Sequence, residues 1–199
     1  MDTYKTIKGR FQGDYREKGS KFFAFLIPIK SEEELKEFIL SLKKEHPQSR
    51  HACYGYRLGH MGEKYRANDD GEPNNSAGMP ILNTLLSYEV TNCASVVIRY
   101  FGGTKLGVPG LINAYKTATK LALDEAKIVD VVIRESIFFE YPYDKTGEFM
   151  RIAGKYDVVY KDPTFSESCL QELKIRMSDV KPLLQEISET YGITIQDEH

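Results

Sequence analysis

The sequence predicts an α+β protein of two domains, and three observations lead to this fold class. The chain has 199 residues, enough for two small domains that each bury a core. Residues 1–132 mix predicted strands with three predicted helices. Residues 133–199 run strand, helix, strand, strand, helix, strand, and this βαββαβ order is typical of the ferredoxin-like plait.

The first elements follow from local signals. Two apolar segments, residues 4–15 and 20–29, flank the turn-like stretch "REKGS" and predict a hairpin. Ser31 and Glu34 form a capping box that begins a helix, and Pro47 lies soon after its end. The stretch "SRHACYGYRLG" then predicts a third strand.

A long polar connection follows, "EKYRANDDGEPNNSAGMP". Its Gly, Pro and Asn content argues against regular structure over much of its length, and its length suggests a function. We interpret it as Asp-Gly and Glu-Pro turns, with Ser76 capping a short helix that has Pro80 in its first turn. The β-branched run "CASVVIRYF" predicts a buried strand, and a helix is expected from Pro109 to about Glu125.

Two patterns define the predicted C-terminal domain. Along "LQELKIRM", apolar residues alternate with charged ones, which predicts one buried and one wet face; the apolar set is Leu173, Ile175 and Met177. The second helix carries an apolar stripe made of Val180, Leu183, Leu184, Ile187 and Tyr191. We therefore expect domains at residues 1–132 and 133–199.

The charge and the cysteine content bear on which partners and which cellular compartment are expected. The net charge of −2 gives no general sign of tight nucleic-acid binding, but residues 1–132 carry 19 Lys and Arg against 16 Asp and Glu, so an anionic partner should prefer them. Cys53, Cys93 and Cys169 form no C-x-x-C pair and predict reduced thiols. The longest apolar run, "FFAFLIPI", is too short to span a membrane, so a cytoplasmic location is expected, with no membrane partner.

The glycine-rich stretch "RYFGGTKLGVPGLINAY" lies between a predicted strand and a predicted helix. Such a junction can bind an anion, because free N–H groups and the positive end of the helix dipole point into it. A nucleotide-binding P-loop is excluded because Val108 and Pro109 stand where Lys and Ser or Thr are needed. Two alternatives remain: an anion nest flanked by Arg99 and Lys105, or glycines that only permit turns.

Neither a metal site nor a catalytic set emerges. Asp69, Asp70 and Glu72 could share a cation, but no frame of the EF-hand pattern fits them. His51 and Cys53 share one side of a strand, yet they lack an identifiable third group to orient a nucleophile–base pair. We therefore predict no metal, no cofactor and no catalytic residue.

Several motifs occur together and in order. "HACYGYRLG", "NDDGEPNNSAGMPIL", "VVIRYFGGTKLGVPGLINAY" and the plait-like C-terminal segment together resemble the YigZ/IMPACT family of translation-linked proteins, over nearly the whole chain. The resemblance implies a first domain similar to domain IV of elongation factor G, followed by a ferredoxin-like domain. It also implies that the two motif-rich loops lie close together and form the most distinctive surface of the first domain.

The resemblance and the two loops give the candidate binding residues. They are His51, Asp70, Gly71, Glu72, Pro73, Ser76, Arg99, Tyr100, Gly102, Gly103, Lys105, Gly107, Gly110 and Tyr115. The expected function is non-catalytic: a regulatory or binding protein that contacts a ribosome-associated protein or RNA, with an anion bound at the glycine loop. The alternative is a small hydrolase or other enzyme that acts on an anionic or peptide substrate between the loops, with Glu72, Asp70 or His51 as acid or base.

This chain also departs from the family pattern. Met79 and Asn113 replace residues that are often basic in relatives, so two positive charges are absent from the expected surface. Fewer cations mean fewer phosphate contacts, which weakens the expectation of a bound anion. Pro109, where relatives have glycine, removes one N–H group from the helix start but presets the helical φ angle.

Overall fold

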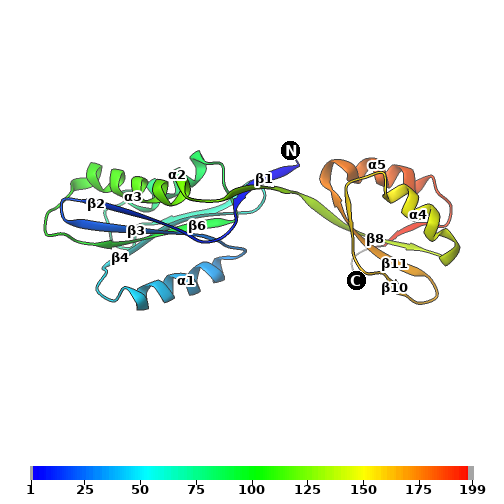
Figure 1. Ribbon diagram of the computed structural model, residues 1–199, viewed down its shortest axis with the longest axis horizontal. Helices are drawn as coiled ribbons and strands as arrows, with labels where there is room; N and C mark the ends of the chain where they lie inside the picture. Colours follow the sequence, from blue (N-terminus) through cyan, green and yellow to red (C-terminus); the bar gives the residue numbers. More distant parts are fainter. Residues whose placement is uncertain (1, 197–199) are drawn as a thin grey trace. The chain divides into compact units, whose positions relative to one another are not determined.

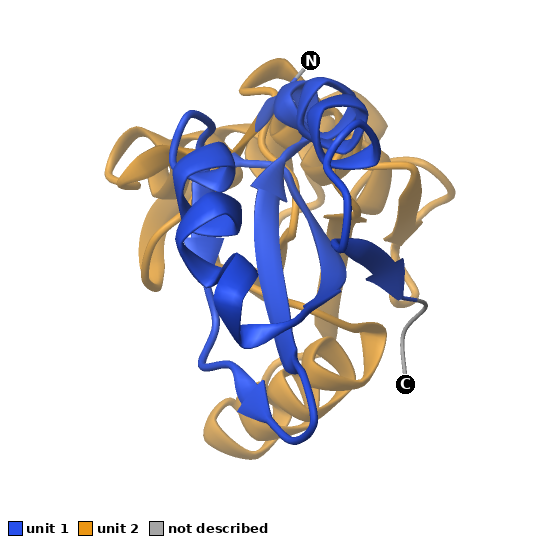
Figure 2. Ribbon diagram, turned by 90° about the vertical axis from the view of Figure 1, so that its right-hand side faces the viewer, with its two compact units in different colours: residues 1–3, 132–199 blue, residues 4–131 orange. Residues whose placement is uncertain are grey.

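The computed structural model describes residues 2–196. The chain divides into two compact units (Figure 2). The larger unit comprises residues 4–131, and the smaller unit is built from the remaining described residues, with residues 2 and 3 grouped with the C-terminal segment. The chain is therefore a mixed α and β protein with several antiparallel sheets.

A five-stranded sheet forms the centre of the larger unit. Its strands are antiparallel and lie in the order β2 (Phe11–Glu17), β3 (Ser20–Pro28), β6 (Cys93–Tyr100), β4 (His51–Leu58) and β5 (Lys64–Asn68). One face carries α1 (Glu32–Glu45), and the other carries α2 (Gly78–Ser87) and α3 (Gly107–Asp124) (Figure 1). β1 (Thr3–Ile7) and β7 (Ile128–Val132) pair separately as a two-stranded sheet.

Alternation along the strands gives each sheet face its own core. On the α1 face, Leu35 packs with residues such as Ile98, whereas on the other face Tyr115 of α3 packs with Phe22 and Val97. β6 is central and covered on both sides, and its residues 93–99 are all buried, so the predicted buried strand is confirmed. Full burial of one such aromatic or aliphatic side chain contributes roughly 1.5–3 kcal/mol.

Local signals located the hairpin and the first helix correctly. β2 and β3 pair through a turn in which Lys18 and Gly19 have φ angles of 46° and 80°. The Ser31 hydroxyl accepts a hydrogen bond from the Glu34 N–H at 3.3 Å, as a capping box requires. The Glu34 carboxylate returns to the N–H of Lys30, one residue before the expected partner, at 2.8 Å.

The polar connection contains more regular structure than expected. Its first part forms β5, which pairs with residues Tyr54 to Leu58 of β4. All five β5 residues are exposed or half-buried, because β5 is an edge strand with little core to contact. The expectation of largely irregular structure was therefore wrong for Lys64–Asn68, since the pairing partner, and not the apolar pattern, determines this strand.

The smaller unit has a sheet of its own. Its elements are β8 (Arg134–Tyr141), the short 3-10 turn η1 (Tyr143–Lys145), α4 (Thr146–Ala153), β9 (Val158–Tyr160), β10 (Thr164–Phe165), β11 (Cys169–Arg176), α5 (Met177–Ser188) and β12 (Thr194–Gln196). β11 pairs with β8, β9 and β10, and β8 also pairs with β12, always antiparallel. Phe139, Phe149 and Leu173 are fully buried in its core.

Two apolar residues of the predicted C-terminal patterns lie outside this core. Leu173 and Ile175 are buried as expected, but Met177 begins α5 and is 44% exposed. Likewise Leu183 and Ile187 are buried, whereas Tyr191 lies beyond the end of α5 and is 92% exposed. Both predictions were wrong because each residue lies outside the strand or helix to which its apolar pattern assigned it.

A glycine in β2 sets the distance between the sheet and α3. A Cβ atom added at Gly13 would lie 2.4 Å from the Ala122 backbone nitrogen and 2.5 Å from the Ala118 carbonyl oxygen. We expect Gly13→Ala to lower the free energy of unfolding by about 1–3 kcal/mol, the usual cost of overpacking, measured by urea denaturation.

Gly147→Ala in α4 is the matched control. A Cβ atom there meets nothing within 4 Å, so this change should raise helix stability by about 0.5–1 kcal/mol. A Gly13→Ala protein with unchanged stability would contradict the close approach of β2 and α3.

Candidate functional site

Two loops of the larger unit lie at the same end of the paired strands β4 and β6. The acidic loop, residues 69–77, connects β5 to α2, and the glycine loop, residues 101–106, connects β6 to α3. His51 of β4 lies opposite Arg99 of β6, and each of these two side chains bonds to the acidic loop. The motifs that were expected to lie together therefore do so.

A buried ion pair joins the acidic loop to the strand that leads into the glycine loop. Arg99 Nη1 donates to Glu72 Oε1 at 2.5 Å, and the Tyr115 hydroxyl of α3 donates to the same oxygen at 2.8 Å. Glu72 is 8% exposed and Arg99 7% exposed. The guanidinium carbon of Arg99 also lies 5.5 Å from the centre of the Phe22 ring. Glu72, Arg99 and Tyr115 thus hold the loops in place from below the surface.

Cys53 belongs to the same hydrogen-bond network, and its thiol is unsuited to react. Its Sγ lies 3.3 Å from the Tyr115 hydroxyl oxygen and 2.9 Å from the Asp69 carbonyl oxygen. Burial raises the pKa of the Cys53 thiol far above its usual range, and the nearby Glu72 carboxylate adds to the rise. Burial likewise raises the pKa of the Tyr115 hydroxyl. Both groups stay protonated at neutral pH, so Cys53 is unsuited to act as a nucleophile.

Asp69 begins α2. Its Oδ1 accepts from the backbone N–H groups of Ala77 at 3.0 Å and Gly78 at 2.8 Å, and its Oδ2 accepts from Asn75 at 2.8 Å. The expectation that Ser76 caps this helix was wrong, because the Ser76 hydroxyl donates instead to the Pro73 carbonyl oxygen at 2.6 Å. The cap comes from eight residues before Ala77, a distance that the usual local capping patterns do not cover.

Asp70 fastens the acidic loop to the start of β4. Its Oδ2 accepts from the Ala52 N–H at 2.7 Å and lies 3.1 Å from Lys43 Nζ. His51 Nδ1 lies 2.8 Å from the Asp70 carbonyl oxygen, a hydrogen bond in which the ring nitrogen donates. Gly71 follows with a φ angle of 89°, which favours glycine. The D-D-G-E-P motif therefore builds a rigid loop.

The glycine loop presents main-chain donors. Gly102 is fixed, because its N–H donates to Ser20 Oγ at 3.1 Å and an added Cβ would collide with the Gly19 backbone. The next three backbone N–H groups, at Gly103, Thr104 and Lys105, donate no hydrogen bond within residues 2–196. Three more, at Leu106, Gly107 and Val108, have no partner inside the helix because they belong to the first turn of α3. All but Leu106 are exposed.

The candidate residues thus fall into two groups by burial. Four are buried and cannot present their side chains to a partner: Glu72, Ser76, Arg99 and Tyr115. The others are exposed or half-buried: His51, Asp70, Gly71, Pro73, Tyr100, Gly102, Gly103, Lys105, Gly107 and Gly110. Arg99 therefore does not flank the anion nest as a free cation, because Glu72 already neutralises it. Lys105 is exposed and forms no ion pair within the described residues.

The structure adds two observations on function classes. Among residues 2–196, no group of three or more His, Cys, Asp or Glu side chains is arranged to hold a metal ion. In the same part of the chain, every helix is too short or too polar to cross a membrane.

Comparison with known proteins gives the family. Residues 18–123 match the Impact N-terminal domain. The chain belongs to the IMPACT family. The IMPACT family member YvyE of Bacillus subtilis is 31% identical over 168 residues, which cover 84% of this chain and 77% of that protein. The Escherichia coli IMPACT family member YigZ is 37% identical over 108 residues, 53% of each chain. The family expected from the motifs is therefore confirmed.

A solved structure supports the fold of this IMPACT family protein. The crystal structure of a hypothetical protein matches it with a TM-score of 0.72 and 22% sequence identity, over 100% of this chain and 98% of the other. At this identity the match shows a shared fold and carries no information on activity.

We expect the buried ion pair of this IMPACT family protein to dominate the stability of the loops. Arg99→Leu leaves the Glu72 carboxylate buried without its cation, and the expected cost is about 3–5 kcal/mol in the free energy of unfolding, measured by urea denaturation. The double variant Arg99→Leu, Glu72→Leu should lose less than the two single losses added together, because it leaves no uncompensated charge.

Lys5→Ala provides the comparison for this experiment. Lys5 pairs with Glu89 at 2.7 Å, but both side chains are exposed, so its loss should change stability little. If Arg99→Leu were no more harmful than Lys5→Ala, the Glu72–Arg99 pair would not be what holds the loops together.

The three thiols should be unreactive in the folded protein. Cys53, Cys93 and Cys169 are all buried, and burial raises the pKa of Cys93 to about 12. With a disulfide reagent at pH 8, we expect all three to react only as fast as the protein unfolds, and at once in denaturant. Rapid reaction of one thiol in the folded state would instead reopen the possibility of thiol catalysis.

Proposed function

We propose that this IMPACT family protein is a non-catalytic regulatory or binding protein linked to translation. It contacts a ribosome-associated protein or RNA through the exposed residues of the acidic and glycine loops. Membership of the family fits a translation-linked regulatory role.

The observation that carries this proposal is the set of free donors in the glycine loop. Six consecutive backbone N–H groups, at residues 103–108, have no partner within residues 2–196, and they lie at the positive end of the α3 dipole. Carbonyl, carboxylate or phosphate oxygens of a partner fit such donors. The buried ion pair beneath keeps the loop in one conformation, which lowers the entropy lost on binding.

A binding role is favoured over catalysis because the two candidate carboxylates are already engaged. The Glu72 carboxylate bonds to Arg99 and Tyr115, and the Asp70 carboxylate bonds to Ala52 and Lys43. A general acid or base needs a free position within hydrogen-bond reach of its substrate. The alternative of a small hydrolase would require these contacts to break first.

We also propose a finer description of the fold. The strand order β9-β11-β8-β12, with α4 and α5 as its two helices, supports a ferredoxin-like plait for the smaller unit. The larger unit is proposed to resemble domain IV of elongation factor G. We propose domains at residues 1–132 and 133–199, which differ from these two units only in the placement of the first residues and of Val132, in a protein of the cytoplasm.

Ribosome co-sedimentation over a salt series tests the proposed function. We expect the wild-type protein to sediment with ribosomes or with a ribosome-associated protein, and Lys105→Glu to weaken this association at least about 5-fold, since it reverses the charge beside the donors. For an RNA partner, the slope of log affinity against log salt should also fall by roughly 0.7–0.9 for each phosphate that the variant no longer neutralises.

Lys116→Glu is the matched control. Lys116 is exposed on α3 and forms no ion pair within the described residues, so it changes the net charge equally at a distance from the loop. Equal losses for Lys105→Glu and Lys116→Glu would mean that net charge, and not the glycine loop, controls the association. Absence of any association in low salt would refute the proposal.

A further inference from the structure

The α1 face of the main sheet is only partly covered. A single helix lies on this face, whereas α2 and α3 share the other (Figure 1). Beyond the end of α1, the aromatic residues Phe23, Phe25 and Tyr100 stay half-buried. An open cleft of about 510 Å³ lies there, lined by Gly19, Lys21, Phe23, His46, Tyr100 and Phe101.

The rings of this aromatic cleft are held in fixed positions. His46 Nδ1 lies 2.8 Å from the Tyr100 hydroxyl oxygen, and the two ring centres are 5.9 Å apart. Phe23 packs edge-on against Tyr100, also at 5.9 Å, and lies nearly parallel to the His46 ring at 6.2 Å. Phe101 is 52% exposed, and its ring lies 5.7 Å from the guanidinium carbon of Arg99, so it is not one of these packed rings. The cleft therefore offers flat apolar surfaces that are already ordered before any ligand arrives.

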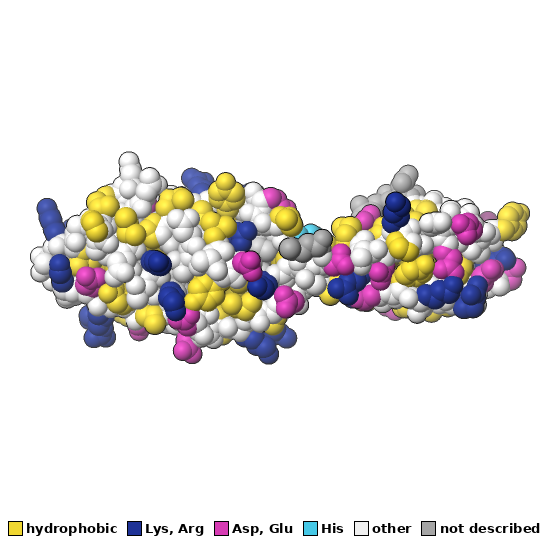
Figure 3. All heavy atoms as spheres, turned by 90° about the horizontal axis from the view of Figure 1, so that it is seen from above, with side chains coloured by type: hydrophobic (Ala, Val, Ile, Leu, Met, Phe, Trp, Pro, Cys, Tyr) yellow, Lys and Arg dark blue, Asp and Glu magenta, His cyan; other side chains and the backbone are white. Residues whose placement is uncertain are grey.

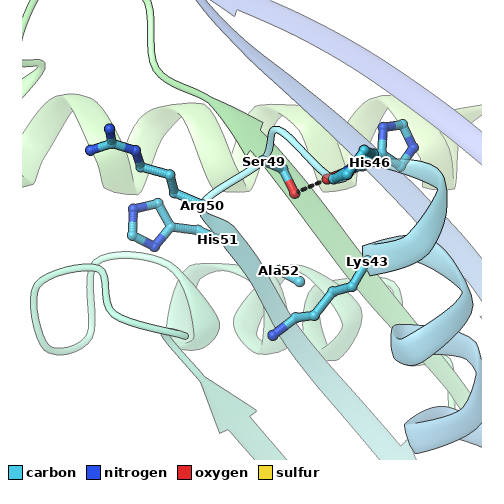
Figure 4. A pocket seen from close by; sticks show the side chains of 7 residues that line it. Lys43, His46, Ser49, Arg50, His51 and Ala52 are labelled. Carbon is cyan, nitrogen blue, oxygen red and sulfur yellow. Dashed lines mark hydrogen bonds between the residues drawn. The ribbon is translucent and has the colours of Figure 1, made fainter.

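A second, cationic cavity of about 240 Å³ shares His46 with the aromatic cleft. Lys43, Arg50 and His51 are among its lining residues. Figure 4 shows these three side chains pointing to the same side, whereas the His46 ring points the other way. The end of α1 and the turn before β4 thus separate a cluster of basic groups from the aromatic rings.

Several cations around the two cavities are uncompensated. Lys43 is paired with Asp70, but Arg50, Lys21 and Arg16 form no ion pair within the described residues. Arg16 lies directly across from Lys21 in the β2–β3 ladder, so both project from the same face. The acids next to the cavities are Asp14, across from Phe23, Glu17, across from Ser20, Glu45, beside His46, and Asp70, which is paired with Lys43. Lys21 and Arg16 project together beside the aromatic cleft and are the cations that remain for a ligand there. An anion is the complementary ligand.

We propose that the aromatic cleft binds a nucleotide unit, with its base against the rings of Phe23 and Tyr100 and its phosphate beside Lys21 and Arg16. A single-stranded RNA segment supplies this chemistry, because ordered aromatic rings beside cations are the usual way to hold unpaired bases and their backbone. The site goes beyond the proposed function: of the residues that line the aromatic cleft, only Tyr100 is among the candidate residues of the two loops.

The chemistry of the cavities favours a nucleotide over an apolar peptide segment. The aromatic cleft is short, and basic residues border it on both sides: Lys21 lies within it, and Arg50 and Lys43 lie beyond His46. An apolar segment would leave these cations without partners. A phosphate attached to a planar base satisfies both the aromatic rings and Lys21.

Fluorescence anisotropy with a labelled single-stranded RNA decamer of mixed sequence tests this inference. Phe23→Ala should weaken binding by roughly 5- to 150-fold, the loss expected when one base loses its stacking partner. Lys21→Ala should reduce the slope of log affinity against log salt by about 0.7, as expected when one phosphate of a single strand is no longer neutralised. Thermal unfolding of each variant confirms that it is folded.

The control variants lie on the other side of the sheet. Tyr65 is 65% exposed and lies across from Arg57, and Lys116 is on α3, which belongs to the side of the molecule seen in Figure 3. Tyr65→Ala and Lys116→Ala each remove one group of the same kind as the test variants do, an aromatic ring and a cation. They should bind the decamer as the wild type does.

Each outcome of these binding experiments supports or overturns the proposed nucleotide site. Tight binding of adenosine monophosphate would support the site and identify free nucleotides as its source, whereas decamer binding alone would point to RNA. Equal competition by duplex RNA, equal losses in test and control variants, or no binding of either probe would overturn the inference. Binding of the decamer without ribosome association would leave this inference standing while the proposed function fails, and the reverse result would do the opposite.

Discussion

The buried ion pair between Glu72 and Arg99 is the interaction on which both loops depend. Removing two charges from water is costly, so a buried pair persists only when its geometry is good and further hydrogen bonds satisfy it. Here the Tyr115 hydroxyl supplies such a bond, and it comes from a third element, α3. One carboxylate therefore ties together the acidic loop, β6 and α3, and the path of the glycine loop between β6 and α3 is fixed as a result.

This arrangement changes how the motif residues are understood. In the acidic loop, the side chains of Asp69, Asp70 and Glu72 all bond inward, to the backbone of α2, to the backbone of β4 and to Arg99 respectively. Acidic residues in a loop are usually interpreted as free ligands for a cation or a substrate. Here they build the frame, and what they leave exposed is main chain.

Much of the fold follows from local signals, and what the sequence could not predict depends on partners distant in the chain. The β2–β3 hairpin and the start of α1 at Ser31 were predictable because their determinants lie within a few residues. β5 was missed because its order comes from pairing with β4 and not from apolar alternation. The cap of α2 was misassigned to Ser76 because the true acceptor, Asp69, reaches it only after the chain has turned at Gly71.

The candidate site illustrates the same limit. The residue types and their proximity were predictable from the motifs, but burial was not, since it depends on α3 and the sheet closing over Arg99 and Glu72. The aromatic cleft could not be predicted from the sequence, for another reason. Its residues come from β3, β6 and the end of α1, which are far apart in the sequence.

Because side chains alternate along a strand, the end of β6 contributes to both faces of the sheet. Arg99 points to the α3 side of the sheet, where it meets Glu72, and Tyr100 points to the α1 side, where it meets His46. The next residues, Phe101 and Gly102, lead into the loop that carries the free amides. A shift of one residue in the pairing of β6 would exchange these two side chains and bury a tyrosine where the ion pair belongs. The register of β6 therefore fixes the buried frame, the glycine loop and the aromatic cleft together.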